Sequence, residues 1–191
     1  FAEEIIGKGL GKIVCFKYLK EEKRFGSPQT VIQESFHLSY PFVFQHENSW
    51  YMIPETGDSG NVILYKSESF PYHWAKQKSL LEGKKLYDAT PFEHNGKWYC
   101  FASERSKATL TPNDLLQLYI LEDGPLGVWK EHPASPIKID VRGGRSAGKI
   151  FQKEGRTFRP AQLGAPKYGY AIQMYEILHL DEFKYEECLV D

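Results

Sequence analysis

Three arginines in the C-terminal half of the sequence are the side chains best suited to bind an anionic group. They are Arg142, Arg145 and Arg159. A guanidinium group offers planar N–H donors that bind a carboxylate or a phosphate in bidentate fashion. We expect Arg142-Gly-Gly-Arg145 to be a mobile, exposed loop, which would suit a uronic acid, a phosphosugar or a nucleotide-sugar. Arg159 precedes Pro160 in an expected strand, so an ion pair between Arg159 and Asp88 is an equally open interpretation.

His37 is the histidine best placed to hydrogen-bond a sugar hydroxyl, because it precedes a Ser-Tyr-Pro turn. The alternative is a structural histidine whose ring nitrogens are satisfied within the fold. No two histidines have the spacing of transition-metal ligands, and no Ser or Cys nucleophile lies in a Gly-x-Ser-x-Gly context. The glycines of residues 7–11 lack the strand, helix and acidic residue of a dinucleotide site. We expect no cofactor, while calcium stays open because isolated aspartates and carbonyl groups leave no sequence signature.

The composition is that of an ordinary globular protein, with 41% hydrophobic and 26% charged residues among 191. The formal net charge is −1, which gives no reason to expect a nucleic acid or an anionic membrane as partner. No apolar run approaches the roughly 20 residues that span a bilayer. Three scattered cysteines and the lack of a glycosylation sequon favour a reducing, cytoplasmic compartment. Because the sequence starts at Phe1 rather than Met, we expect a processed or truncated piece of a longer protein.

An internal repeat is the strongest structural signal in the sequence. PFVFQHENSWY (41–51) aligns with ATPFEHNGKWY (89–99), and GKIFQKEGRTF (148–158) is a third copy. Their turns centre on Glu47-Asn48, Asn95-Gly96 and Glu154-Gly155. Asn and Gly tolerate the positive φ that tight hairpins need. Each copy therefore predicts two strands joined by a short hairpin turn.

Each copy continues into a third and a fourth expected strand, so the repeating unit is a four-stranded antiparallel sheet. Sheets of this kind that repeat at roughly 40 to 60 residues are typical of propeller blades. Residues 1–3 and 13–16 fit the second and third strands of an earlier copy, whose innermost strand is absent.

We therefore predict an all-β chain that forms a β-propeller or a fragment of one. Its four units are residues 1–36 (incomplete), 37–83, 84–141 and 142–191. Because 191 residues are few for a closed ring at this repeat length, we favour part of a five-bladed propeller. A β-sandwich is the alternative fold, and it would not require the repeat.

Five segments form an ordered series that covers nearly the whole chain. They are HLSYPFVF (37–44), YMIPET (51–56), LYDATPFEHNGKWY (86–99), DVRGGRSAGKIF (140–151) and RPAQ (159–162). The series resembles the N-terminal propeller domain of plant glucosamine inositolphosphorylceramide transferases and of bacterial relatives. More distantly, the repeats are similar to the five-bladed propeller glycosidases of the arabinanase and invertase type. The resemblance implies a carbohydrate-related role.

The glycosidase resemblance gives the acidic residues a possible catalytic meaning. Those enzymes hold carboxylates on innermost strands around the mouth of the channel, and the equivalent positions here are Tyr40, Asp88 and Ala147. Only Asp88 is acidic, whereas hydrolysis of a glycosidic bond needs two carboxyl groups. The second would be Glu55 or Glu104, each expected just after a second strand. The alternative for these acids is a structural role, such as a turn carboxylate that accepts backbone N–H bonds.

Three functions stay open. The chain is expected to bind a sugar or sugar-phosphate at the channel mouth, as an accessory to a glycosyltransferase or another transferase. The alternatives are a glycoside hydrolase that uses Asp88 and a glutamate, and a protein-interaction propeller. Two carboxyl groups roughly 5 to 10 Å apart would favour hydrolysis, whereas an Asp88 held by an arginine would favour binding. A further domain or chain is expected to complete the ring.

The candidates for ligand binding are His37, Tyr40, Arg142, Arg145, Arg159 and Gln162.

Overall fold

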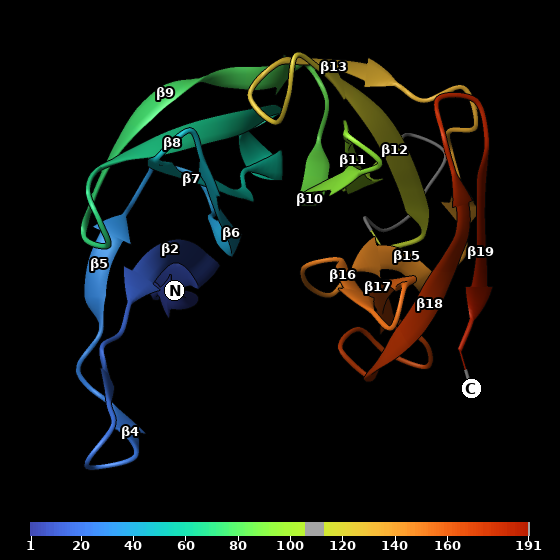
Figure 1. Cartoon of the computed structure of the whole chain (residues 1–191). Helices are drawn as coiled ribbons and strands as arrows, with labels where there is room; N and C mark the ends of the chain where they lie inside the picture. The colour runs from blue at the N-terminus through green and yellow to red at the C-terminus, as the bar shows by residue number, and fades with distance from the viewer. Residues whose placement is uncertain (106–112, 191) are drawn as a thin grey trace. The chain divides into compact units, whose positions relative to one another are not determined.

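The computed structural model describes residues 1–105 and 113–190, and strands make up nearly all of its regular structure (Figure 1). Two short 3-10 turns, Gly7–Gly9 and Gly57–Ser59, are the helices found in these residues. None of them is long or apolar enough to cross a membrane. The predicted all-β class is therefore confirmed. The chain divides into two compact units, Phe1–Gly83 and Lys84–Asp191.

The first sheet of unit 1 has three antiparallel strands in the order β1–β2–β5. They are Ala2–Ile6, Leu10–Cys15 and Gln29–Ile32. Strand β1 holds the place of a second strand, so the sheet lacks an innermost strand, as the repeat predicts. A small hairpin of β3 (Tyr18–Leu19) and β4 (Arg24–Phe25) is inserted between β2 and β5 and projects from this sheet (Figure 1). The repeat did not predict this hairpin.

The second sheet of unit 1 has four antiparallel strands in the order β6–β7–β8–β9. They are Ser39–His46, Ser49–Glu55, Asn61–Ser69 and His73–Glu82. The core between the two sheets consists of side chains that are almost fully buried. Its members are Ile13, Ile32, Leu38, Met52, Ile63 and Tyr65.

Unit 2 also contains two sheets. The first has the order β10–β11–β12–β13, with β14 also paired to β12; these strands are Leu86–His94, Lys97–Glu104, Leu115–Glu122, Val128–Glu131 and Lys138–Ile139. The second has the order β15–β17–β18–β19, with strands Arg142–Ser146, Arg156–Leu163, Ala171–Leu180 and Tyr185–Leu189. A short strand, β16 (Phe151–Lys153), also pairs with β17. Buried residues of both sheets, among them Phe101, Leu118 and Ile177, share one hydrophobic cluster.

The three predicted hairpin turns are confirmed. Each joins its strands through two residues, as the facing pairs His46–Ser49, His94–Lys97 and Lys153–Arg156 show. Both turn residues have positive φ in every case, for example 51° at Asn95 and 77° at Gly96. Turns of this kind match the twist of the strands that they join.

Tyr40 and Asp88 occupy equivalent bulges in β6 and β10. Their φ angles are 42° and 52°, and the strand register shifts at each of them. A bulge turns one side chain away from the regular alternation of the strand. Ala147, the third equivalent residue, lies between β15 and β16 and has no positive φ.

The expectation of an exposed, mobile Arg142-Gly-Gly-Arg145 loop is wrong. These residues lie in strand β15, where Gly143, Gly144 and Arg145 are buried. A β-carbon on Gly143 would lie 2.7 Å from the Tyr175 hydroxyl oxygen, and one on Gly144 would lie 2.7 Å from the Asp140 carbonyl oxygen. The glycine pair therefore permits close packing rather than mobility.

Replacement of Gly96 by alanine should lower the free energy of unfolding by about 1 kcal/mol, because a β-carbon disfavours its positive φ. No atom lies within 4 Å of the added β-carbon, so the loss reports the backbone alone. Gly7→Ala is the matched control, since Gly7 has equally open space and no positive φ. Urea denaturation measures both, and equal losses in the two variants would contradict the prediction.

Candidate functional site

A buried ion pair between Asp88 and Arg145 is the centre of the candidate site. Asp88 on β10 is 2% exposed and Arg145 on β15 is 9% exposed. The arginine Nε donates to Oδ2 at 2.5 Å, and Nη2 donates to Oδ1 at 3.3 Å. Because Asp88 sits at a bulge with one extra residue, its side chain departs from the alternation of β10. Arg145 lies directly opposite Gln162 of β17. The pair thereby connects the two sheets of unit 2.

Polar and aromatic side chains surround this pair. Gln162 Nε2 donates to Asp88 Oδ2 at 3.2 Å, and Arg145 Nη1 donates to Asn113 Oδ1 at 2.9 Å. The guanidinium carbon lies 5.7 Å from the ring centre of Tyr87 and 5.3 Å from that of Tyr168. Tyr168 is 61% exposed, so the cluster reaches the surface of unit 2 at this ring.

Both oxygens of the Asp88 carboxylate accept hydrogen bonds within the fold. Burial raises its pKa above the ordinary value, and Arg145 opposes that rise through its charge and its hydrogen bonds. Three N–H groups, two from Arg145 and one from Gln162, point at its two oxygens. An acid held in this way is poorly placed to attack a sugar or to activate water, since its lone pairs already accept hydrogen bonds.

Glu55 is the last residue of β7 and is buried in unit 1. It accepts hydrogen bonds from the Ser39 hydroxyl at 2.7 Å and from the Gly57 backbone N–H at 2.9 Å. Ser39 lies directly opposite it in the strand register. These contacts connect the end of β7 to the start of β6 and to the following 3-10 turn.

Glu104 ends β11 in unit 2, and its contacts differ from those of Asp88. It accepts a hydrogen bond from Gln117 Nε2 at 2.7 Å and lies 3.9 Å from Lys84 Nζ. The repeat aligns Ser103, and not Glu104, with Glu55, and successive strand residues face opposite sides of a sheet. The two glutamates therefore occupy non-equivalent positions in their sheets.

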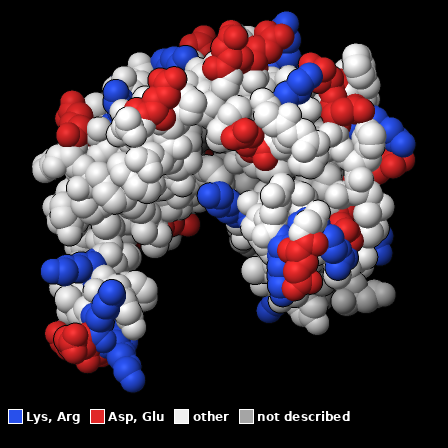
Figure 2. Space-filling view, viewed as in Figure 1, with Lys and Arg blue, Asp and Glu red and all other residues white. Residues whose placement is uncertain are grey.

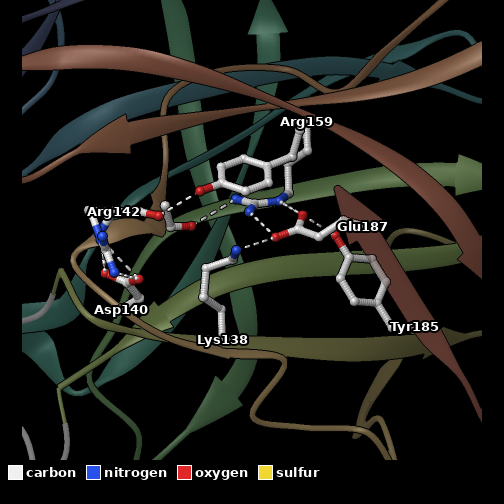
Figure 3. Close-up of polar contacts among 8 residues, drawn as sticks. Lys138, Asp140, Arg142, Arg159, Tyr185 and Glu187 are labelled. Carbon is white, nitrogen blue, oxygen red and sulfur yellow. Dashed lines mark hydrogen bonds and ion pairs between the residues drawn. The ribbon is translucent and has the colours of Figure 1, made fainter. Parts of the chain in front are cut away.

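The interpretation that pairs Arg159 with Asp88 is wrong, because the partner of Arg159 is Glu187 on β19 (Figure 3). Arg159 is 1% exposed and donates from Nε and Nη2 to the two Glu187 oxygens, each at 2.8 Å. Its Nη1 donates to the Gly143 carbonyl oxygen at 3.1 Å. Arg159 and Gln162 are three positions apart on β17 and so face opposite sides, which leaves Gln162 to contact Asp88.

Several neighbours hold Glu187 in place (Figure 3). Lys138 Nζ lies 2.8 Å from Oε1, and the Tyr185 hydroxyl donates to Oε2 at 2.6 Å. Burial acts to raise the pKa of Glu187, but Arg159, Lys138 and Tyr185 outweigh it and leave the pKa below its ordinary value. Arg159 is thus part of a buried structural network.

Arg142 has an exposed position on β15. Its Nη2 lies 2.9 Å from Asp140 Oδ2, so an acidic neighbour already occupies the guanidinium.

In unit 1, His37 is satisfied within the fold. The Gly11 N–H donates to its Nδ1 at 3.0 Å, and its Nε2 lies 3.2 Å from Glu3 Oε1. Tyr40 stacks on Phe42 with ring centres 6.5 Å apart.

Asn113 and Tyr168 were not predicted as site residues, because they lie outside the repeated strands that indicate the other positions. The described residues contain no group of three or more His, Cys, Asp or Glu side chains that could hold a metal ion.

The sequence profile of "Glucosamine inositolphosphorylceramide transferase 1, N-terminal" matches residues 11–191. The chain belongs to this family. It is 35% identical to glucosamine inositolphosphorylceramide transferase 1 of Oryza sativa subsp. japonica over 162 residues, which are 84% of this chain and 22% of that protein. For the Arabidopsis thaliana protein of the same name the identity is 33% over 161 residues, or 83% and 21% of the two chains. The chain therefore spans about a fifth of the length of these relatives.

Solved structures of glycosidases share the fold. A mutant of the GH43 protein BlXynB from Bacillus licheniformis aligns with a TM-score of 0.65 at 12% identity, over 97% of this chain and 38% of that chain. The α-L-arabinofuranosidase of Lactobacillus brevis gives 0.56 at 15% identity, over 85% and 61%. The GH32 β-fructofuranosidase BmSUC1 of Bombyx mori gives 0.54 at 18% identity, over 81% and 37%. The predicted propeller-like arrangement of four blades is therefore confirmed.

Replacement of Asp88 by asparagine should lower the free energy of unfolding by about 3 kcal/mol, because it leaves the buried Arg145 without a counter-charge. Asp140→Asn is the matched control, since it removes the same charge from the exposed pair with Arg142 and should cost much less. Urea denaturation followed by circular dichroism measures both variants. Similar losses in the two would show that the Asp88 pair contributes no more than a surface pair.

Replacement of Glu187 by glutamine should destabilise the chain most near neutral pH. The pKa of Glu187 is lowered in the fold, so its contribution to stability is complete above the ordinary value of 4.5 and is lost as pH falls through the lower folded value. The difference in unfolding free energy between the wild type and Glu187→Gln should shrink below that pH. Denaturation curves at several pH values measure it, and a difference that grows on acidification would contradict the assignment.

Proposed function

We propose that this chain is a carbohydrate-binding domain that holds a sugar or a sugar-phosphate at the mouth of the propeller channel. In this proposal it serves as an accessory to a glycosyltransferase or another transferase. The observation that carries the proposal is the engagement of Asp88 by Arg145 and Gln162, because Asp88 is the acidic residue among the three equivalent innermost-strand positions. The site thus retains polar groups for recognition but not a free carboxylate for catalysis.

The chemistry of the cluster suits a sugar. Hydroxyl groups donate and accept hydrogen bonds, so planar amide, carboxylate and guanidinium groups pair with them well. Gln162 is partly exposed beside the buried pair, and Tyr168 presents an exposed ring on which the apolar face of a sugar would pack. Sites of this kind combine aromatic surface with a few fixed polar groups.

Family membership supports the transferase part of the proposal. The curated relatives are named as transferases, and this chain matches about a fifth of their length. The reaction could then belong to another part of such a protein, with this domain engaging the carbohydrate. Among the solved structures of similar fold, the GH43_1 enzyme from Xanthomonas citri is described as complexed with xylotriose, with a TM-score of 0.57 at 12% identity.

Glycoside hydrolysis is the second candidate function, because glycosidases share the fold. It would require Asp88 to be released from Arg145 and a second carboxyl group, from Glu55 or Glu104, to act with it. Hydrolysis of aryl glycosides by the wild type that is lost in a folded Asp88→Asn variant would favour this alternative over binding.

We also propose that the complete propeller has five blades. The first sheet lacks an innermost strand, and β1 is left as an edge. Unpaired strand edges readily accept another strand. A strand from a further domain or chain would complete this sheet, and a further sheet would close the ring.

Binding is tested by nuclear magnetic resonance titration of the chain with neutral monosaccharides, uronic acids and phosphosugars. Replacement of Tyr168 by alanine should weaken binding roughly fivefold to tenfold, because the exposed ring contacts the sugar face. Tyr170→Ala is the matched control, since Tyr170 is 56% exposed in the same segment and makes no described contact with Arg145. Absence of binding to every compound, or equal losses in the two variants, would contradict the proposed site.

A further inference from the structure

Seven aromatic side chains of unit 1 form one connected surface, here called the aromatic patch. They are Phe1, Phe16, Tyr18, Phe25, Trp50, Phe70 and Trp74. Ring contacts form two groups. In the first, ring centres are 5.3 Å apart for Tyr18–Phe25 and 6.1 Å for Phe16–Phe25; in the second, they are 6.0 Å apart for Phe1–Phe70, 5.7 Å for Phe1–Trp74 and 4.5 Å for Trp50–Phe70. A cavity of about 290 Å³, lined by Phe1, Ala2, Phe16 and Phe25, joins the two groups of rings.

Much of this patch is open to solvent. Phe25 is 65% exposed, Tyr18 is 50% exposed and Phe70 is 44% exposed. Scattered apolar side chains on a surface need no explanation, but a contiguous apolar patch marks a place of contact with another molecule or with a membrane. Because its cavity is lined by apolar side chains, the patch differs from the polar cluster around Asp88.

Positive charge adjoins the patch on hairpin β3–β4. Residues 17–25 contain four basic side chains and two acidic ones, a net charge of +2. Glu22 is engaged by Arg24, whose Nε donates to it at 2.6 Å. Lys17, Lys20 and Lys23 are exposed, and none of them forms an ion pair with any residue that the structure describes. Figure 2 shows charged groups at the end of this hairpin, at the lower left, beside uncharged surface.

We propose that the aromatic patch and these three lysines dock unit 1 on a lipid surface that contains anionic phospholipid. Aromatic rings are favoured at the boundary between lipid headgroups and acyl chains. Lysines near an anionic leaflet add attraction that falls off within a few ångströms to about 10 Å. The even net charge of the whole chain conceals this local excess.

A lipid surface fits these residues better than a protein partner does. Protein interfaces are enriched in aromatic side chains and arginine but depleted of lysine. Here the cations beside the rings are three lysines, while the arginine of the hairpin is engaged by Glu22. The contact would be an interfacial one, in which exposed rings enter the headgroup region without crossing the bilayer.

The experiment measures sedimentation of the purified chain with vesicles of phosphatidylcholine, with and without roughly one-third phosphatidylserine. The wild type should bind the anionic vesicles more tightly, and added salt should weaken binding. Binding to the vesicles should be accompanied by quenching of Trp50 and Trp74 fluorescence by brominated lipid, because both tryptophans belong to the patch.

Two variants test the two parts of the surface. Lys20→Glu with Lys23→Glu should weaken binding to anionic vesicles by roughly 30-fold or more, at about fivefold for each lysine removed. Phe25→Ser should weaken binding by roughly tenfold, because it removes an exposed apolar ring. Both changes lie on an exposed hairpin, so the fold should persist, which circular dichroism checks.

Matched controls lie in unit 2. Phe183→Ser removes a ring that is 78% exposed, and Lys153→Glu reverses an exposed lysine. Neither should change vesicle binding by more than about twofold, because neither residue belongs to the aromatic patch or to hairpin β3–β4. Failure of the wild type to bind anionic vesicles, or losses no larger than in these controls, would overturn the proposal. Equal binding to neutral and anionic vesicles would overturn it as well.

Discussion

The buried pair of Asp88 and Arg145 is the interaction on which the second unit of this protein depends. Removal of two charges from water is costly, and the cost is recovered only when geometry and additional hydrogen bonds are good. Here the carboxylate accepts two N–H groups from Arg145 and one from Gln162, and Asn113 accepts a further N–H from Arg145. Such a pair tolerates little displacement, so it fixes how strands β10 and β15 meet.

The three arginines that the sequence suggests as anion-binding residues have three different roles. Arg145 holds Asp88, Arg159 holds Glu187 on the outer strand, and Arg142 pairs with Asp140 at the surface. The first two are buried and each joins strands that are far apart in the chain. Their positive charge is balanced inside the fold, which is why a cluster that looks anion-binding in sequence has little free charge in the structure.

The ion pair with Arg145 also limits the chemistry that is open to Asp88. Propeller glycosidases and this chain share a fold, but fold alone does not determine chemistry. An acid whose oxygens are occupied by an arginine and an amide contributes shape and hydrogen-bonding pattern to a site, not a proton. The exposed Tyr168 beside it supplies apolar surface, and the carbohydrate-binding role that we propose rests on these two features together.

The strands of the repeated units, the two-residue hairpins at Asn95-Gly96 and its counterparts, and the lack of an innermost strand in the first sheet can all be predicted from the sequence. These follow from local rules, since turn residues tolerate positive φ and side chains alternate along a strand. The pairing of Asp88 with Arg145 rather than Arg159, and the burial of Gly143 and Gly144, became clear only from the folded chain. The bulge at Asp88 adds one residue to β10 and thereby reverses which face the following side chains occupy. Its partner Arg145 lies 57 positions away in the chain.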